Sequence, residues 1–308
     1  MVVFSLVATA HAQDGARPVD PAVQMDTLNV RDTLYHLSHG GGNSLVLIDE
    51  INGGVVLVDT KLPGQGPSVQ EVIEQVTDLP ITTIISTHAH ADHAGANREF
   101  PTVTEIVAHE YTGQALTDAL GAAETSAAGL ATTTFTDRFS LLEGLDRIEL
   151  YYFGAAHTAG DIVVVFPEKE VAYLGDLFPS KATPVIDTDH GGSGVSFPDT
   201  LEKAVAAIDG VARVITGHGP FPTTYAGRGR REQGADRAWT GWMTWEDLAE
   251  YAGFNRAFLT AVSASFRAGH TIDEAVASLS TDLPEPYAEY GMEHARANVE
   301  AIYNELGR

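Results

Sequence analysis

Three histidines and an aspartate lie within six residues of this chain, in the run His88-Ala89-His90-Ala91-Asp92-His93. Imidazole nitrogens and carboxylate oxygens bind metals, and burying several of them together requires partners. In an extended or turning segment alternate residues share a face, so His88 and His90 can bind one ion while Asp92 and His93 point toward a second position. Zinc suits such a set of nitrogen and oxygen ligands.

Three further candidate ligands follow downstream, each close to glycine. His157 follows a Gly-Ala-Ala run, Asp176 follows a glycine, and His218 lies between two glycines. With the first run they make five histidines and two aspartates, enough for two metal ions with positions left open for water. The chain has no cysteine, which excludes disulfides, cysteine-based zinc sites and cysteine nucleophiles.

The candidate ligands fall where predicted strands end, so loops on a rigid scaffold can bring them together. The predicted strands are Leu45–Ile48 and Val55–Asp59 (a hairpin), Ile81–Ser86, Glu105–Ala108, Ile148–Tyr152, Ile162–Phe166, Val171–Leu174 and Ala212–Ile215. Helices are predicted over Ser68–Val76, Tyr111–Leu120 and Leu201–Ile208. Because strands and helices alternate twice, we expect two β-sheets flanked by helices, an α/β architecture.

These motifs resemble the metallo-β-lactamase superfamily. The shared features are His88-x-His90-x-Asp92-His93, then His157 in His-Thr-Ala-Gly-Asp, then Asp176 in Gly-Asp and His218 in Gly-His-Gly. The similarity extends from about Leu34 to about Pro220 and includes Val58-Asp59 at an early strand end. The resemblance implies a four-layer αβ/βα sandwich with a dinuclear site on one edge of the paired sheets.

The resemblance also implies a role for each motif residue. His88, His90 and His157 would hold a first zinc, while Asp92, His93 and His218 would hold a second, with Asp176 bridging the two ions. Asp59 would orient the histidine run through hydrogen bonds. The same ligand set also suits iron or manganese.

Two cations that share a water lower its pKa and produce a hydroxide that can attack a carbonyl, with Asp92 orienting the nucleophile and moving a proton. We therefore expect a hydrolase of a small ester, lactone, amide or β-lactam. Many family members with β-lactamase activity carry cysteine where this chain has Asp176, so β-lactam hydrolysis stays open. The alternatives are a glyoxalase II-like thioesterase and a non-haem iron oxygenase on the same fold.

The long, glycine-rich segment Ser180–Phe197 follows a ligand-bearing strand and should overhang the site. Within it, Asp187 and His190 are candidate substrate contacts, although a solvent-facing role for His190 is somewhat favoured. The chain has 18 Lys and Arg against 42 Asp and Glu, a net charge of −24. Such an acidic surface repels phosphate backbones, so a small molecule is the expected partner and nucleic acid is not.

Three parts are predicted along the chain: residues 1–12, 25–240 as the catalytic domain, and 245–308 as a C-terminal helical extension. The apolar run Val2–Ala8 followed by Ala10-His11-Ala12 is typical of a secretory signal peptide, which predicts a periplasmic or secreted enzyme. No other apolar run is long enough for membrane insertion. The C-terminal helices can dock on their own domain or on a second chain, which leaves a homodimer open. Residues 225–237 are rich in arginine and are predicted to be a loop of unassigned role.

Overall fold

Two β-sheets face each other across a shared apolar core in the computed structural model, which describes residues 24–27, 33–120, 127–218, 243–288 and 290–307. The seven-stranded sheet has its strands in chain order, from β1 to β7. Its first four strands pair antiparallel, and β4 to β7 pair parallel. Its strands are β1 (Gln24–Thr27), β2 (Leu34–Ser38), β3 (Ser44–Asp49), β4 (Gly54–Val58), β5 (Ile81–Ser86), β6 (Glu105–His109) and β7 (Thr133–Phe135).

The second sheet has five strands in the order β12-β11-β10-β9-β8. Only β11 and β12 pair parallel, and the remaining neighbours are antiparallel. Its strands are β8 (Arg138–Leu141), β9 (Ile148–Tyr151), β10 (Val163–Phe166), β11 (Val171–Tyr173) and β12 (Arg213–Ile215). The helices are α1 (Gly66–Ile73), α2 (Ala91–Ala94), α3 (Glu110–Leu120), α4 (Phe197–Ala207), α5 (Trp245–Arg267), α6 (Ile272–Asp282) and α7 (Ala295–Leu306).

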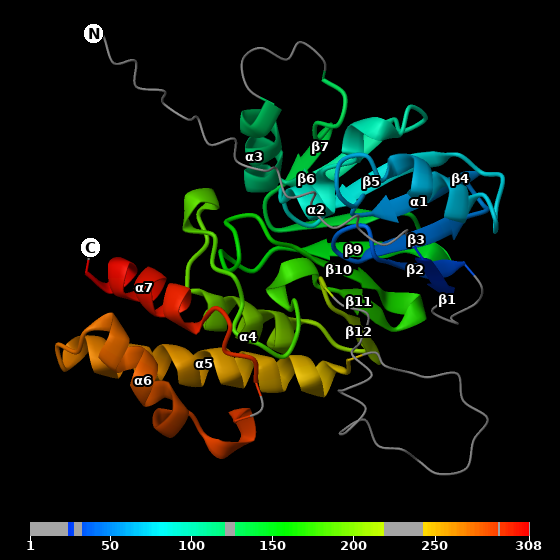
Figure 1. Ribbon diagram of the computed structural model, residues 1–308. Helices are drawn as coiled ribbons and strands as arrows, with labels where there is room; N and C mark the ends of the chain where they lie inside the picture. Colours follow the sequence, from blue (N-terminus) through cyan, green and yellow to red (C-terminus); the bar gives the residue numbers. More distant parts are fainter. Residues whose placement is uncertain (1–23, 28–32, 121–126, 219–242, 289, 308) are drawn as a thin grey trace, which may run out of the picture.

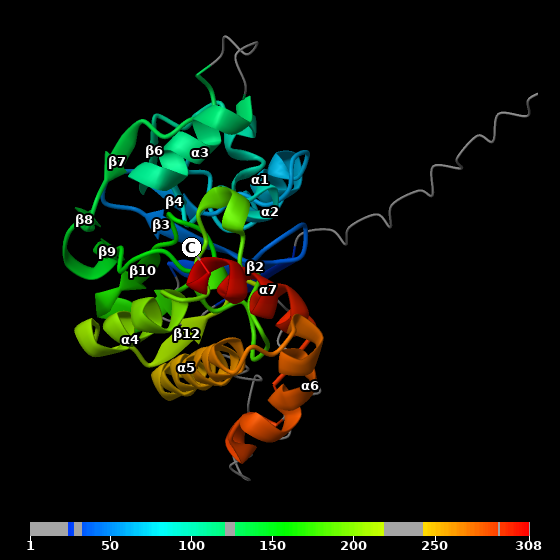
Figure 2. The same ribbon diagram turned by 90° about the vertical axis from the view of Figure 1, so that its left-hand side faces the viewer.

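Three apolar cores separate the layers, because both faces of each sheet are covered. In β10, Val163 and Val165 face the helices, whereas Val164 and Phe166 face the other sheet. This alternation is the two-residue period of a strand, and it makes β10 a continuous apolar run. The result is an αβ/βα sandwich with C-terminal helices, as predicted, with α4 and α5 on the outer face of the five-stranded sheet (Figures 1 and 2).

Helix α5 packs on α4 and on β12 of the five-stranded sheet, and α7 packs on α5 and α6. Helix α6 begins at a capping box, because Thr271 Oγ1 accepts from the Glu274 backbone and the Glu274 side chain accepts from the Thr271 backbone. None of the helices formed by the described residues is both long and apolar enough to span a bilayer.

Several details differ from the prediction. The histidine run was expected to be a loop throughout, but Asp92 and His93 belong to the one-turn helix α2, and the predicted helix 68–76 starts and ends earlier, at Gly66 and Ile73. Proline at the start of α1 favours the earlier beginning. The predicted leader at residues 1–12 and the arginine-rich loop 225–237 lie outside the described residues.

Candidate metal centre

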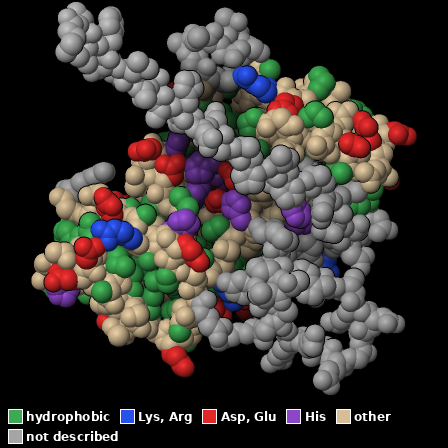
Figure 3. Space-filling model, viewed as in Figure 1, with side chains coloured by type: hydrophobic (Ala, Val, Ile, Leu, Met, Phe, Trp, Pro, Cys, Tyr) green, Lys and Arg blue, Asp and Glu red, His purple; other side chains and the backbone are tan. Residues whose placement is uncertain are grey.

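All seven predicted ligands lie together at one edge of the sandwich, where strands of both sheets end. They come from the segment after β5, from α2, from the loop between β9 and β10, and from the ends of β11 and β12. Figure 3 shows histidine side chains gathered on this face of the molecule, between its two halves. In chain order they are His88, His90, Asp92, His93, His157, Asp176 and His218.

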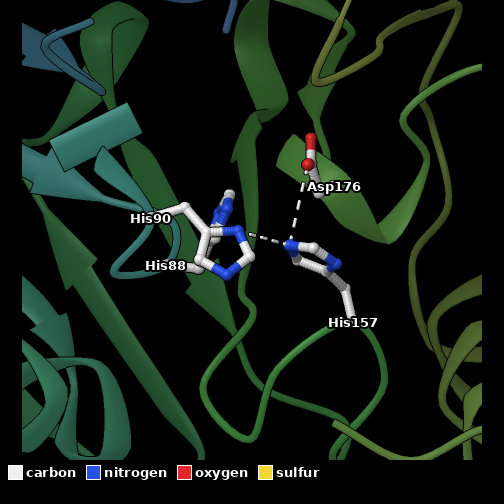
Figure 4. A group of neighbouring side chains, drawn as sticks. All are labelled: His88, His90, His157 and Asp176. Carbon is white, nitrogen blue, oxygen red and sulfur yellow. Dashed lines mark hydrogen bonds and ion pairs between the residues drawn. The ribbon is translucent and has the colours of Figure 1, made fainter. Parts of the chain in front are cut away.

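The ligand atoms form two neighbouring groups. We call His88, His90 and His157 the first triad; their ligand atoms and that of Asp176 all lie within 4.8 Å of one another (Figure 4). We call Asp92, His93 and His218 the second triad; their ligand atoms also lie within 4.8 Å of one another.

Asp176 lies between the two triads. Its Oδ2 is 3.6 Å from His157 Nε2 in the first triad and 3.2 Å from His218 Nε2 in the second. Its Oδ1 is 3.4 Å from His93 Nε2. The carboxylate therefore faces both groups at once, which is the placement that a bridging ligand requires.

The ligand atoms that face the centre lie close to one another and not to the hydrogen-bond partners that buried polar atoms usually have. His90 Nδ1 lies 2.9 Å from His157 Nε2, and His93 Nε2 lies 3.5 Å from His218 Nε2. His88 Nε2 and Asp176 Oδ1 are buried and have no hydrogen-bond partner within the described structure. Because buried polar atoms in native proteins are almost always satisfied, these two atoms indicate a place for a cation, and the nitrogen and oxygen donors fit zinc.

Three imidazoles are fixed through the nitrogen that faces away from the centre. His93 Nδ1 donates to Asp59 Oδ2 at 2.7 Å, and His90 Nε2 donates to Asp187 Oδ2 at 2.6 Å. His157 Nδ1 donates to the carbonyl oxygen of Val185 at 2.8 Å. An acceptor on one ring nitrogen keeps the proton there, so the other nitrogen presents its lone pair to the centre.

Asp59, predicted to orient the histidine run, is completely buried directly after β4. Its Oδ1 accepts from the Thr87 backbone at 2.8 Å, and its Oδ2 accepts from the Thr87 hydroxyl at 2.7 Å. The Tyr173 hydroxyl lies 2.9 Å from the same oxygen. With φ at 58°, Asp59 also has a left-handed backbone that ordinary residues rarely adopt. The strained backbone and the complete bonding of this buried carboxylate indicate that Asp59 holds the ligand His93 in place.

Charge coupling across the centre appears in the pKa values of its buried groups. Burial, together with neighbouring His93, holds the pKa of His88 well below its usual value. Burial alone would also lower the pKa of His93, but the Asp176 and Asp59 carboxylates outweigh it and raise the pKa well above the usual value. Burial alone would raise the pKa of Asp176, but His93 and His218 outweigh it and lower the pKa. The site therefore favours an ionised Asp176 and a neutral His88, as metal binding needs, whereas His93 would have to release a proton when a cation binds.

The segment predicted to overhang the site does so. Asp187 contacts His90 and also accepts from His190 Nδ1 at 2.6 Å. His190 is more exposed, at 49% of its side-chain surface. A hollow of about 10 Å³ lies beside these rings, and it is lined partly by Tyr111, Ala115 and Gly160. It has room for about one water molecule.

Several supporting groups were not found from the sequence. Thr87 lies directly before His88 in the sequence, so its position beside a candidate ligand could have marked it as a supporting residue. Tyr173 lies within a strand whose residues are all buried, and a hydroxyl in such a strand must find a partner. The Val185 contact is made by a backbone carbonyl, so no side chain at that position could signal it.

A sequence model of the metallo-β-lactamase superfamily matches residues 38–218, which is more than half of the chain. Among solved structures, a metallo-β-lactamase from Pontibacter korlensis superposes with a TM-score of 0.56 at 17% identity, over 76% of this chain and 99% of that chain. At this identity the superposition supports the fold alone.

Among curated relatives, the 2,4-dinitroanisole O-demethylase subunit alpha of Nocardioides sp. (strain JS1661) is 31% identical over 158 residues, or 49% of this chain. The match spans 46% of that relative, so about half of its length is represented here. The type 2 metallo-β-lactamase of Bacteroides fragilis is 25% identical over 59% of this chain and 70% of its own length.

Proposed function

The chain belongs to the metallo-β-lactamase superfamily, and on this basis we propose that it is a hydrolase that binds two zinc ions and cleaves a small carbonyl substrate. The substrate class is an ester, lactone, amide or β-lactam. The observation that carries the proposal is the position of Asp176 between two triads of inward-facing ligand atoms.

The two triads would hold one cation each, with Asp176 contacting both. When bound, such cations lower the pKa of a water molecule and polarise a carbonyl oxygen. Asp92 is the candidate proton carrier, because its side chain is 31% exposed and its Oδ2 lies 3.4 Å from His218 Nε2. An ionised carboxylate in this place can accept a proton from an attacking water and return it to the leaving group.

The test begins with metal analysis of the purified protein, followed by a substrate screen. The substrates are nitrocefin, a γ-lactone, p-nitrophenyl acetate and a glutathione thioester, each with and without a chelator. We expect two zinc ions per chain and chelator-sensitive turnover of at least one oxygen ester or cyclic amide. Turnover of the thioester alone would select the thioesterase alternative. One iron per chain with oxygen uptake would overturn the hydrolase.

A second candidate function is hydrolysis of an activated aryl methyl ether. The relative named an O-demethylase subunit is 31% identical to this chain over 158 residues. In this reaction the oxygen of water bonds to the ring carbon, the bond from that carbon to the methoxy oxygen breaks, and methanol leaves with a proton. Incubation with 2,4-dinitroanisole in ¹⁸O-water tests it, since the label must enter the phenol. Unlabelled phenol or the absence of methanol removes this candidate.

A further inference from the structure

The C-terminal helix α7 contacts the segment that supports the first triad. We propose that Glu305 and Asn298 of α7 are positioning residues: they fix residues 183–194, here called the support segment, which orients His90 and His157. The inference rests on the proposed function only in treating these two histidines as ligands.

Helix α7 ties the support segment at both ends. Glu305 accepts from Ser193 Oγ at 2.5 Å and from the Gly194 backbone at 2.8 Å. Near the other end, Asn298 Nδ2 donates to the carbonyl oxygen of Pro184 at 2.9 Å. Asn298 is buried, so this bond is shielded from competing water.

The turn before α7 adds backbone contacts at the beginning of the segment. The Thr183 N–H donates to the carbonyl oxygen of Gly291 at 2.7 Å, and the His294 N–H donates to Thr183 Oγ1 at 3.0 Å. At the far end there is no room for a side chain at position 194, because a Cβ there would lie 2.6 Å from Ile302 Cγ1. Helix and segment therefore form one packed unit.

Between these ties, the support segment reaches the first triad. The Val185 carbonyl accepts from His157 Nδ1 and the Asp187 carboxylate accepts from His90 Nε2. The Asp187 N–H donates to the carbonyl oxygen of His157 at 2.9 Å, and the Ser193 N–H donates to that of Ala156 at 2.9 Å. Glu305 is thus linked through Ser193 to the same loop that carries His157.

The segment depends on these contacts because it has little regular structure of its own. Its described secondary structure is the single 3₁₀ turn Thr188–His190. A segment without a strand ladder opens at a free energy set by its tertiary contacts. Residues 291–305 lie outside the span matched by the superfamily model, which ends at residue 218. The appended helices therefore complete the support of a site built by the matched region.

The test compares Glu305→Ala with Glu300→Ala. Glu300 lies on the same helix and is exposed, so the control loses the same charge without touching the segment. Zinc affinity is measured by chelator competition, and hydrogen exchange is measured in metal-free protein. We expect Glu305→Ala to lower the affinity for one zinc ion roughly three- to tenfold. This is less than the 10–100-fold loss typical when a direct hydrogen-bond partner of a metal ligand is removed. Exchange should rise in residues 183–194 and not in residues 81–93, and Glu300→Ala should match the wild type.

Two further variants separate positioning from general destabilisation. Glu305→Gln keeps one acceptor oxygen and should fall between the wild type and Glu305→Ala. Ser193→Ala combined with Glu305→Ala should lose little more than the worse single variant, because both remove the same bond. The visible spectrum of the cobalt-loaded protein should change in Glu305→Ala and be restored toward wild type in Glu305→Gln.

Wild-type affinity, exchange and cobalt spectrum in Glu305→Ala would overturn the proposal, and so would faster exchange spread over the whole chain. Failure of the wild type to bind any metal would contradict the proposed function instead. In that case, exchange confined to the support segment would still show that Glu305 positions it.

Discussion

On both sides of the metal centre a histidine donates a hydrogen bond to an aspartate, but the two aspartates lie in different surroundings. On the second triad, buried His93 donates to Asp59, which is bonded to Thr87 and Tyr173 in the protein core. On the first triad, His90 is 24% exposed and donates to Asp187, which lies on the support segment. The two distances differ by little, 2.7 Å and 2.6 Å, so geometry alone does not reveal which support is rigid. The burial of each aspartate and the number of its other hydrogen-bond partners show which support is the more rigid.

The variant with the largest expected effect is Asp59→Ala, which tests whether the core support of His93 is the more rigid one. It leaves several buried donors without an acceptor, so we expect a loss of about 3–5 kcal/mol of unfolding free energy in metal-free protein. Zinc affinity should fall 10–100-fold. Urea denaturation and chelator competition measure both. Asp49→Ala is the control, because Asp49 is also buried at a strand end but its side chain, among the described residues, bonds to Asn52 alone. Equal losses in the two variants would mean that the Asp59 network is ordinary.

Metal removal should separate the two sides in one experiment. At a free zinc concentration 100 times Kd, chelation should lower the unfolding free energy by about 2.7 kcal/mol for each zinc site. Hydrogen exchange should then rise in residues 183–194 while residues 81–93 stay protected, because the core network does not need the metal. A uniform rise on both sides would contradict the difference proposed here.

Asp187→Ala should cost less stability than Asp59→Ala but still weaken the site. The side chain is partly exposed, so we expect a loss below about 1 kcal/mol, whereas zinc affinity should fall roughly tenfold. The same denaturation and competition measurements apply, with Asp189→Ala as the control, since Asp189 is a neighbouring exposed carboxylate. A stability loss as large as that of Asp59→Ala would show that the segment is part of the core.

The pH dependence of Asp187 sharpens the comparison further. Burial alone would raise its pKa, but hydrogen bonds from His90 and His190 outweigh burial and lower the pKa to about 2. A depressed carboxyl pKa stabilises the folded state above the ordinary value of about 4, and this contribution is lost as pH falls through about 2. The difference in unfolding free energy between metal-free wild type and Asp187→Asn should therefore shrink from pH 5 to pH 2. A constant difference would argue against an ionised Asp187.

The smallest expected effect concerns the hollow beside His90. Ala115→Leu places a larger side chain in its lining and should reduce kcat/KM several-fold for substrates whose substituent enters it, because the larger side chain fills the hollow. Ala119→Leu is the same change one turn along α3 at an exposed position and should have no effect. Steady-state kinetics with a series of acyl chain lengths provide the measurement. Equal effects in both variants would exclude the hollow as a subsite.

Local pattern was enough to predict the elements that bear the ligands. The β-branched run Ile81–Ser86 forms β5 with the predicted bounds, and His88 follows it closely. Strand β2 was missed because all five of its residues are buried, His36 and Ser38 among them, so it shows no alternation of apolar and polar residues. Strand β8 is short and largely exposed, and therefore carries a weak apolar signal.

The ligand order was predictable because each motif is local, whereas the supports were not. His90 and Asp187 are 97 residues apart, and Asp59 and Tyr173 are 114 residues apart. Such pairs leave no periodicity in the sequence, since only the fold brings them together. Asp187 was singled out for its loop, but its partner His90 emerges only from the structure.

The glycines around the second triad have a consequence for anyone who designs a library of variants. A methyl group at Gly42 would overlap the His93 ring, and one at Gly217 would overlap the Asp176 carboxylate. Lys61 further fixes this rim, because its Nζ donates to the Gly42 carbonyl at 2.5 Å. Randomising positions 42 and 217 should therefore yield mostly inactive clones, whereas positions 186, 188 and 189 of the support segment leave every bond described for His90 and His157 in place. Variants with new substrate ranges should therefore be sought in the support segment beside the first triad, because its side chains are not fixed by the protein core.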